Sequence, residues 1–370
     1  MSLQGTHIPR AMHIASRIEE DIRSRQLRPG DAYLNTQEIA QLLSVSKSTA
    51  NRAMQLLAKR HVVHRRQRRG VVIGEGIVPS TRPPLRCVHL LVRENFLRTE
   101  GIVGDGMMVG IQQELPGVEV QLNFPSSVDE TETINRLIAT ALRSPEPEGF
   151  VLVRAPLVVQ RLMQSIGLPT VVHGTLFPSV QDLPWIDFDH RQIARALVAN
   201  LLNRGCRRLL YLGRDRIFPG DYHFQDGLME ALNDAKLPAS AISIRHLPAD
   251  HELVKAEVRT LLARSKAASS PSDASASDLG IIAQTEPLAE GAIAAGEALG
   301  MSVGRDVAVV SSIVYRVGSE RPLRYPHIRA AIDPRELGVH IGRMLVAQAR
   351  GRVAQPSHEI IPFELRDRTA

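Results

Sequence analysis

The stretch "VSKSTANRAMQLLAKRHVVHRRQRRGVV", residues 45–72, decides how the N-terminal part of this chain folds. After Ser46, its apolar residues have the spacing of a helix, and its last part is rich in arginine. Six basic residues fall within eleven positions of one another, namely Lys59, Arg60, Arg65, Arg66, Arg68 and Arg69. Guanidinium groups form planar forks that match phosphate oxygens, so the stretch indicates a surface that meets an oxyanion-rich partner.

The positive charge of the chain is confined to the same region. The 370 residues carry a net charge of +6, but residues 1–73 hold 13 Lys+Arg against 5 Asp+Glu, a balance of +8. The remaining residues hold 32 against 34, a balance of −2. A compact basic module on a near-neutral body is typical of a nucleic-acid-binding protein.

The residues around the opening stretch predict a helix-turn-helix. A first helix is expected over 11–26, where isoleucines recur every four residues. Asn35 and Glu38 form a capping-box pattern before a second helix. Ser46 is expected to cap a third helix, Lys47 to Arg60, that buries Ala50, Met54, Leu57 and Ala58 and exposes polar side chains on its other face.

Two short apolar runs after the third helix predict a β-hairpin, or wing, with an arginine tip. Helix, turn, helix and basic wing in this order predict binding to a double-stranded DNA operator. The expected contacts are those of the recognition helix and its surroundings, Gln37, Ser46, Lys47, Ser48, Thr49, Asn51 and Arg52, and those of the wing, Arg65, Arg66, Gln67, Arg68 and Arg69.

These residues resemble the winged-helix domain of GntR-type bacterial transcription regulators from end to end. The shared motifs are Pro29-Gly30-Asp31, Glu38-Ile39-Ala40, Val45 to Thr49 and Gly70 to Ile73. Gln37 and Asn51 stand where the family commonly has operator-contacting arginines. His61 replaces a helix-ending glycine and Arg68 a wing-tip glycine. The fold is expected to survive, since His tolerates the left-handed backbone better than most residues.

The rest of the chain predicts a sensor of two α/β lobes. Residues 74–85 are rich in Pro and Gly and are expected to be a linker between a DNA-binding domain (1–73) and a ligand-sensor and dimerisation domain (86–370). From Arg86 onward, short apolar strands alternate with amphipathic helices, which indicates parallel sheets in βαβ units. The small-polar segment 265–278 is expected to be a flexible surface insertion.

Several motifs in this part resemble the sensor domain of LacI/GalR-type repressors, which has a two-lobed, periplasmic-binding-protein-like fold. They are "WIDFDHRQIARALVANLLNRGCRRLLYLG", "GLMEALNDAKLP", "LGIIAQTEPLAEGAIAAGEALG" and "FELRDRT". The resemblance implies an arabinose-repressor-like hybrid, a homodimer and a small-molecule effector, a sugar or a related compound. Three positions depart from the family: Phe224 replaces its sugar-clamping arginine, and Glu286 and Ile313 replace two aspartates. Asp189 matches the family's aspartate.

A cleft between two such lobes lies at the carboxyl ends of their strands, where ligands bind. The residues that follow predicted strands are therefore the candidate effector-binding residues: Arg93, Glu94, Asn95, Phe96, Arg154, His173, Asp189, Phe218, Tyr222, Phe224, Gln284, Glu286 and Tyr315.

Other classes of protein are less well supported by the sequence. No Ser/His/Asp order, HExxH motif or metal-ligand spacing is found, so neither an enzyme nor a cofactor is expected. The segment 104–110, "GDGMMVG", is interpreted as a helix start rather than a phosphate loop. Two distant cysteines and the lack of a long apolar run predict a cytoplasmic protein. Two alternatives stay open: a small-molecule binding protein with a vestigial DNA-binding head, and a DNA-binding regulator without an effector.

Overall fold

The chain forms two compact units, residues 1–83 and 84–370, called here the head and the body. The structure is a computed structural model. It describes residues 10–25, 27, 29–66, 70–74, 84–92, 105–125, 130–248, 250–268, 278–313, 323–350 and 358–367. Within these residues, no helix combines the length and the apolar character that crossing a membrane requires.

The head contains the three helices that the sequence predicts, α1 (Arg10–Ser24), α2 (Thr36–Leu42) and α3 (Lys47–Lys59). Asn35 caps α2 in a full capping box, because its side chain accepts from the Gln37 and Glu38 amides while Glu38 accepts from the Asn35 amide. The buried face of α3 packs with α1 and α2 around a core of Ile14, Ile18, Ile22, Ile39, Ala50, Met54 and Leu57.

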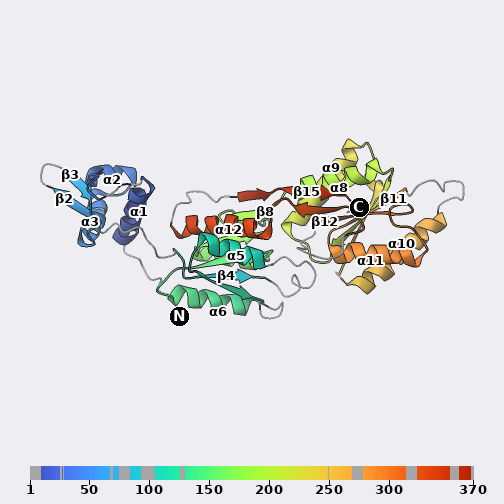
Figure 1. Ribbon diagram of the computed structural model, residues 1–370, viewed down its shortest axis with the longest axis horizontal. Coiled ribbons are helices and arrows are strands. Elements are labelled where there is room, and N and C mark those ends of the chain that lie inside the picture. Colours follow the sequence, from blue (N-terminus) through green and yellow to red (C-terminus); the bar gives the residue numbers. More distant parts are fainter. Residues whose placement is uncertain are drawn as a thin grey trace. The chain divides into compact units, whose positions relative to one another are not determined.

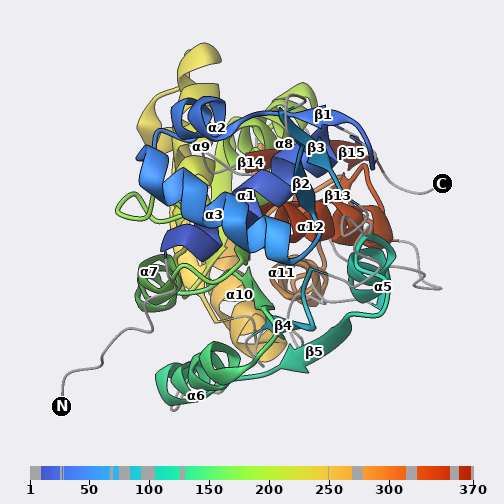
Figure 2. The same cartoon turned by 90° about the vertical axis from the view of Figure 1, so that its left-hand side faces the viewer.

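The wing is present as β2 (Val63–Arg66) and β3 (Gly70–Ile73), paired antiparallel. A two-residue strand that the sequence did not suggest, β1 (Ala32–Tyr33), completes a three-stranded sheet in the order β1-β3-β2 (Figures 1 and 2). His61, between α3 and the wing, has φ +57°, as expected for a residue that replaces a helix-ending glycine. The wing tip, 67–69, lies outside the described residues.

The first lobe of the body is built on a parallel six-stranded sheet in the order β14-β8-β7-β6-β4-β5. Its strands are β4 (Cys87–Leu91), β5 (Glu119–Asn123), β6 (Glu148–Val153), β7 (Thr170–His173), β8 (Trp185–Phe188) and β14 (His358–Ile361). Leu85, the last residue of the expected linker, is fully buried in the core of this lobe, so it packs with the body.

Helices cover both faces of this sheet (Figure 1). Helices α5 (Asp105–Glu114) and α12 (Pro334–Ala349) lie on one face, and α6 (Glu130–Arg143) and α7 (Leu157–Ile166) on the other. Gly110 lets α5 and α12 approach closely, because a Cβ there would lie 2.0 Å from the Arg335 carbonyl oxygen. In the segment 104–110, the described residues 105–110 form the start of α5, as predicted.

The second lobe repeats this architecture. Its sheet has the order β10-β9-β11-β12-β13-β15, parallel except for the last strand. The strands are β9 (Arg208–Arg214), β10 (Ile242–Leu247), β11 (Leu279–Ala283), β12 (Ala308–Ile313), β13 (His327–Ala330) and β15 (Phe363–Arg366).

One face of the second sheet is covered by α8 (His190–Asn203) and α9 (Pro219–Asp234), and the other by α10 (His251–Ala268) and α11 (Glu286–Ala298) (Figure 1). A short 3-10 helix, η1 (Ala239–Ala241), precedes β10. Helix α10 extends to Ala268, so the first residues of the small-polar segment 265–278 are helical rather than inserted loop; residues 269–277 lie outside the described residues.

The chain crosses between the lobes three times, after β8, after β13 and after β14. In each sheet the strand order reverses beside the first strand, β4 in lobe 1 and β9 in lobe 2. Ligands in open α/β sheets bind outside the carboxyl ends of the strands at such reversal points. The topology therefore directs attention to the residues that follow β4, β6, β9 and β11.

Candidate functional site

The recognition helix α3 presents a polar surface opposite its buried stripe. Lys47, Ser48, Arg52 and Gln55 are exposed, and Thr49 and Asn51 are half-buried. Ser46 caps the helix: its Oγ accepts from the Thr49 amide at 3.2 Å and lies 3.0 Å from the Ser48 hydroxyl and 2.8 Å from that of Thr49. Three hydroxyls at a helix N-terminus, where the dipole favours negative charge, suit a DNA phosphate.

Gln37 is also exposed and lies in the first turn of α2. The side chains of the wing residues Arg65, Arg66, Gln67, Arg68 and Arg69 lie outside the described residues, although Arg65 and Arg66 belong to β2. Of the predicted DNA contacts, the structure thus places those of α2 and α3 on exposed or half-exposed positions of one small domain.

The body has a cavity of about 20 Å³ between its lobes, at the carboxyl ends of their strands. Lobe 1 contributes Arg154, Ala155, Gly174, Thr175 and Asp187, and lobe 2 contributes His190, Arg214, Phe218, Gly220 and Asp221. A cavity of this size holds about one water molecule, so a larger ligand enters only if the lobes separate or the lining side chains move.

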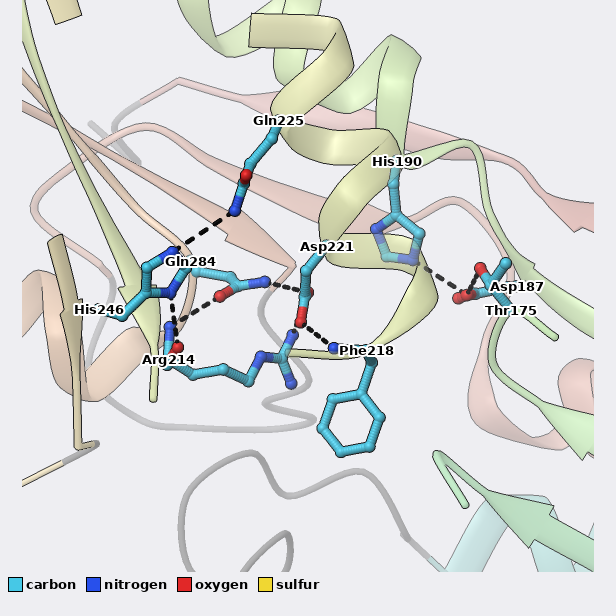
Figure 3. A network of polar contacts seen from close by, with 9 residues as sticks. All are labelled: Thr175, Asp187, His190, Arg214, Phe218, Asp221, Gln225, His246 and Gln284. Atoms are coloured by element: carbon cyan, nitrogen blue, oxygen red, sulfur yellow. Dashed lines mark hydrogen bonds and ion pairs between the residues drawn. The ribbon is translucent and has the colours of Figure 1, made fainter. Parts of the chain in front are cut away.

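On the lobe 1 side, Asp187 organises the polar groups (Figure 3). Its Oδ2 accepts from Thr175 Oγ1 at 2.7 Å and from His190 Nε2 at 3.0 Å, and its Oδ1 accepts from the Phe188 amide. Burial by itself raises the pKa of Asp187, but the nearby His190 and these hydrogen bonds outweigh it and lower that pKa. Asp187 is therefore a carboxylate, able to accept from ligand hydroxyls.

His173 and Arg154 lie beside Asp187. His173 is the last residue of β7 and is buried. Burial lowers the pKa of His173 to about 4, so its imidazole is neutral at pH 7. Within the described residues, its Nδ1 has no hydrogen-bond partner. Arg154 lines the cavity with φ +47°, a rare conformation for a residue other than glycine. Left-handed residues of this kind are concentrated at functional sites.

On the lobe 2 side, Arg214, Asp221 and Gln284 form a buried network (Figure 3). The Arg214 amide donates to Gln284 Oε1 at 2.8 Å, and its guanidinium Nη2 donates to Asp221 Oδ1 at 3.4 Å. Gln284 Nε2 also donates to Asp221 Oδ1, while Asp221 Oδ2 accepts from the Phe218 amide at 2.8 Å. Asp221 lies in the first turn of α9, where the helix dipole stabilises a negative charge.

Further contacts surround this network. The Arg214 carbonyl accepts from His246 Nδ1 at 2.8 Å, which leaves His246 Nε2 to accept from Gln225 at 3.4 Å. The Phe218 ring lies 5.8 Å from the Arg214 guanidinium. Gly220 brings the start of α9 against His190, since a Cβ there would lie 2.6 Å from the imidazole.

The structure separates the predicted cleft residues into groups. Arg154 and Phe218 line the cavity, and His173 and Gln284 are buried behind it. Glu286 lies in the first turn of α11 outside the cavity lining. Arg93, Glu94, Asn95, Phe96 and Tyr315 lie outside the described residues.

Three predicted residues have other positions. Asp189 caps α8, with its Oδ1 accepting from the Gln192 amide at 2.9 Å, so the aspartate in the cavity is Asp187 instead. Phe224 is 1% exposed and stacks on Tyr211 in the core. Tyr222, on the outer side of α9, is 58% exposed. In each case the helical phase, which sequence spacing gave only approximately, decides which side chain faces the other lobe.

Sequence reasoning missed Thr175, Asp187, His190, Arg214 and Asp221. Arg214 had a usable signal, since it directly follows the predicted strand "RLLYLG", residues 208–213, at the reversal point of the lobe 2 sheet. Asp187 and His190 lie on either side of Asp189 in the sequence. Which of the three faces the cavity depends on where strand β8 ends.

Two family models match the chain. Residues 10–73 match the family of bacterial regulatory proteins described as gntR, and residues 198–370 match the periplasmic binding protein-like domain. The chain thus joins a gntR-type regulatory head to a periplasmic-binding-protein-like body, the domain arrangement of a hybrid transcription regulator. This confirms the resemblance drawn from the sequence and supports a ligand-responsive regulator.

Solved structures support the fold of this regulator. A transcriptional regulator CelR–cellobiose complex is 18% identical, with a TM-score of 0.62 over 91% of this chain and 99% of that one. A regulatory protein of the LacI family from Chloroflexus aggregans is 20% identical, with a TM-score of 0.59 over 76% and 97%. CcpA of Lactococcus lactis is 15% identical, with a TM-score of 0.58 over 77% and 98%. No curated protein matches the chain.

Proposed function

We propose that the regulator is a cytoplasmic homodimeric repressor that reads a pseudo-palindromic operator and is controlled by a small molecule bound between its lobes. The observation that carries this proposal is the exposed polar face of α3, with Lys47, Ser48 and Arg52, on the strongly basic head. Two such heads in a dimer would enter successive major grooves of the operator.

The contacts with DNA divide into two kinds. Lys47 and the hydroxyls of Ser46, Ser48 and Thr49 suit backbone phosphates, because they gather at a helix N-terminus. Gln37, Asn51 and Arg52 can reach base edges, where amide and guanidinium groups pair with purines. The wing arginines would add contacts along the backbone or in the minor groove.

The cavity chemistry favours a polar, hydroxyl-bearing effector. Asp187 offers carboxylate oxygens from lobe 1, and Arg154 and Arg214 offer donors from the two lobes. Phe218 supplies an aromatic face of the kind on which a sugar ring can pack. The cellobiose bound to CelR, which shares this fold, supports a carbohydrate and thus control of a carbohydrate-related operon.

Ligand binding would act through the three crossings between the lobes. A ligand that bridges Asp187 on lobe 1 and Arg214 on lobe 2 favours one angle between the lobes, and the head spacing in a dimer depends on that angle. The repressor would then release or bind DNA, depending on whether the ligand binds more tightly to the lobe angle that suits the operator or to the other angle.

Operator binding is tested by measuring DNA affinity as a function of salt concentration. Several phosphate contacts per head predict a steep linear fall of log K against log salt, with a slope of about −0.9 per contact. A slope near zero would contradict the proposal. Sedimentation at the same protein concentrations tests the dimer.

The effector is tested by thermal shift with sugars, sugar phosphates and nucleosides. A true effector raises the melting temperature of the body and changes the affinity for DNA. DNA should change the affinity for the effector by the same factor.

The small cavity and the internally paired Arg214–Asp221–Gln284 network also favour a second candidate, a DNA-binding regulator without an effector. In that case no compound stabilises the body, while the salt dependence of DNA binding stays steep.

A further inference from the structure

A second and larger cavity lies at the opposite edge of lobe 2. Its volume is about 330 Å³, and its walls come from β9, β10, β11, α10 and the segment around η1. Arg208 and Leu279, which line it, are the first residues of β9 and β11, whereas Arg214 at the cleft is the last residue of β9. Six residue steps along a strand separate the two ends by about 20 Å.

The cavity exists because α10 leaves part of the edge strand β10 uncovered. Side chains of β10 alternate between the two faces of the sheet. Ile242 and Ile244 pack on the side of α8 and α9, whereas Ser243 and Arg245 belong to the side of α10. Ser243 pairs in register with Leu210, which lies in the core under α10. The polar side chains of β10 therefore lie next to apolar side chains of β9.

The charges around this cavity have one sign. Arg208, Arg245 and Arg264 come from three different elements, and none of the lining residues is acidic. All three are exposed, and their guanidiniums form no ion pair with another described residue. Arg245 donates to the neighbouring Ile244 carbonyl at 2.8 Å. Ser240 and Ser243 add two hydroxyl donors.

Apolar side chains form the remaining walls. Leu262 and Leu210 are buried, and Leu261 and Leu279 are half-buried. The volume lies within the ~300–1,000 Å³ range of small-molecule sites, which combine apolar walls with a few converging polar groups. Scattered surface arginines without a pocket would be solvated and would bind nothing in particular; here three of them surround one cavity that also has apolar walls.

We propose that this cavity is a second ligand site, which takes a small organic phosphate with an apolar body. The guanidiniums of Arg208, Arg245 and Arg264 would hold the phosphate oxygens, since arginine forks bind this group in a bidentate manner. The two serine hydroxyls would complete the shell, and the leucines would contact the apolar body. The site is independent of the cleft and gives the regulator a second input.

Titration calorimetry of the full chain with phenyl phosphate tests this site. Phenyl phosphate is expected to bind more tightly than inorganic phosphate, which lacks the apolar body, and than benzyl alcohol, which lacks the charge. Arg208→Ala and Arg245→Ala should each weaken binding by about tenfold, the usual effect of losing a charged hydrogen bond. Ser243→Phe should abolish binding by filling the cavity.

Arg259→Ala is the matched control, because Arg259 is an exposed arginine of α10 outside the cavity lining. This variant should leave the affinity for phenyl phosphate unchanged. All of these variants should leave the affinity of the head for DNA unchanged. Equal binding of phenyl phosphate and inorganic phosphate overturns the proposal, and so does an affinity that Arg245→Ala and Ser243→Phe leave intact. Neither result bears on operator recognition, which is measured separately with DNA.

Discussion

In the head, Ser46, Lys47, Ser48 and Arg52 lie within seven consecutive residues and face the solvent. In the body, Arg154, Asp187 and Asp221 come from three distant segments and enclose a cavity of about 20 Å³. The head presents an exposed surface whose function depends on charge, whereas the cavity is a closed set of paired groups whose function depends on opening. Changes in the head should therefore alter DNA affinity, and changes in the cavity should first alter the stability of the body.

The largest effect is expected from removing the wing arginines. Replacing Arg65, Arg66, Arg68 and Arg69 with Ala together should weaken DNA binding by roughly a thousandfold at low salt, because each phosphate contact contributes to counterion release. The slope of log K against log salt should become shallower by about one for each arginine that contacts a phosphate. Fluorescence anisotropy with operator or generic duplex DNA measures both.

The melting temperature of the body serves as the control for this variant and should not change. If DNA retention survived the fourfold replacement, the head would not be the DNA-binding surface, and the contrast between the two regions would break down.

Cutting the buried network in lobe 2 should have the next largest effect. Arg214→Ala leaves Asp221 buried without its guanidinium partner, a loss that costs about 3 kcal/mol of stability in comparable buried pairs. Denaturant unfolding of the body should register this loss, while nonspecific DNA affinity stays the same. Arg216→Ala, an exposed arginine two residues further along, is the control and should be near neutral.

Acidification should destabilise the body through His173. Because burial lowers its pKa from about 6.5 to about 4, the unfolded chain binds a proton between these values that the folded chain does not. The free energy of unfolding therefore falls as the pH decreases from 6.5 to 4, by at most about 3 kcal/mol from this group. His173→Gln should flatten this part of the profile, and an unchanged difference between pH 7 and pH 4.5 would mean that His173 does not titrate as described.

The smallest effect is expected at the cap of the recognition helix. Ser46→Ala removes the acceptor of the Thr49 amide and should cost the head about 1 kcal/mol. Ser46→Asp keeps an acceptor, so it should restore stability but weaken DNA binding by placing a negative charge where a phosphate is expected. Thermal unfolding and anisotropy separate these two consequences. If Ser46→Ala lowered affinity without lowering stability, its hydroxyl would contact DNA directly.

The two regions also differ in how far the sequence predicts them. The capping box of Asn35 and Glu38, the Ser46 cap and the left-handed His61 were predicted correctly. Of the predicted buried stripe of α3, Ala50, Met54 and Leu57 are buried, whereas Ala58 is half-buried and the buried Ala53 was missed. Each depends on residues within a few positions of one another, for which helix geometry and backbone sterics give the answer directly. Most strands of the body were predicted for the same reason, since they are short apolar runs, whereas β14 was not predicted.

The cavity could not be predicted at the level of residues. Whether Asp187 or Asp189 faces the other lobe depends on where β8 ends and α8 begins, and a shift of two residues turns a ligand-facing carboxylate into a helix cap. Likewise, Phe224 and Asp221 lie on the same helix, three residues apart, but one packs on Tyr211 and the other meets Arg214. Sequence patterns fix such boundaries only to within a few residues.

By itself, then, the sequence determined the basic winged helix, the parallel two-lobed body and their order along the chain, because local propensity and hydrophobic period govern these features. Only the tertiary structure decided which side chains meet: the Arg214–Asp221–Gln284 network, the Asp187–His190 pair and the arginine-lined cavity beneath α10. The physical reason is that these contacts join residues up to 70 positions apart, as Arg214 and Gln284 are, and strand register together with helix packing sets their distances.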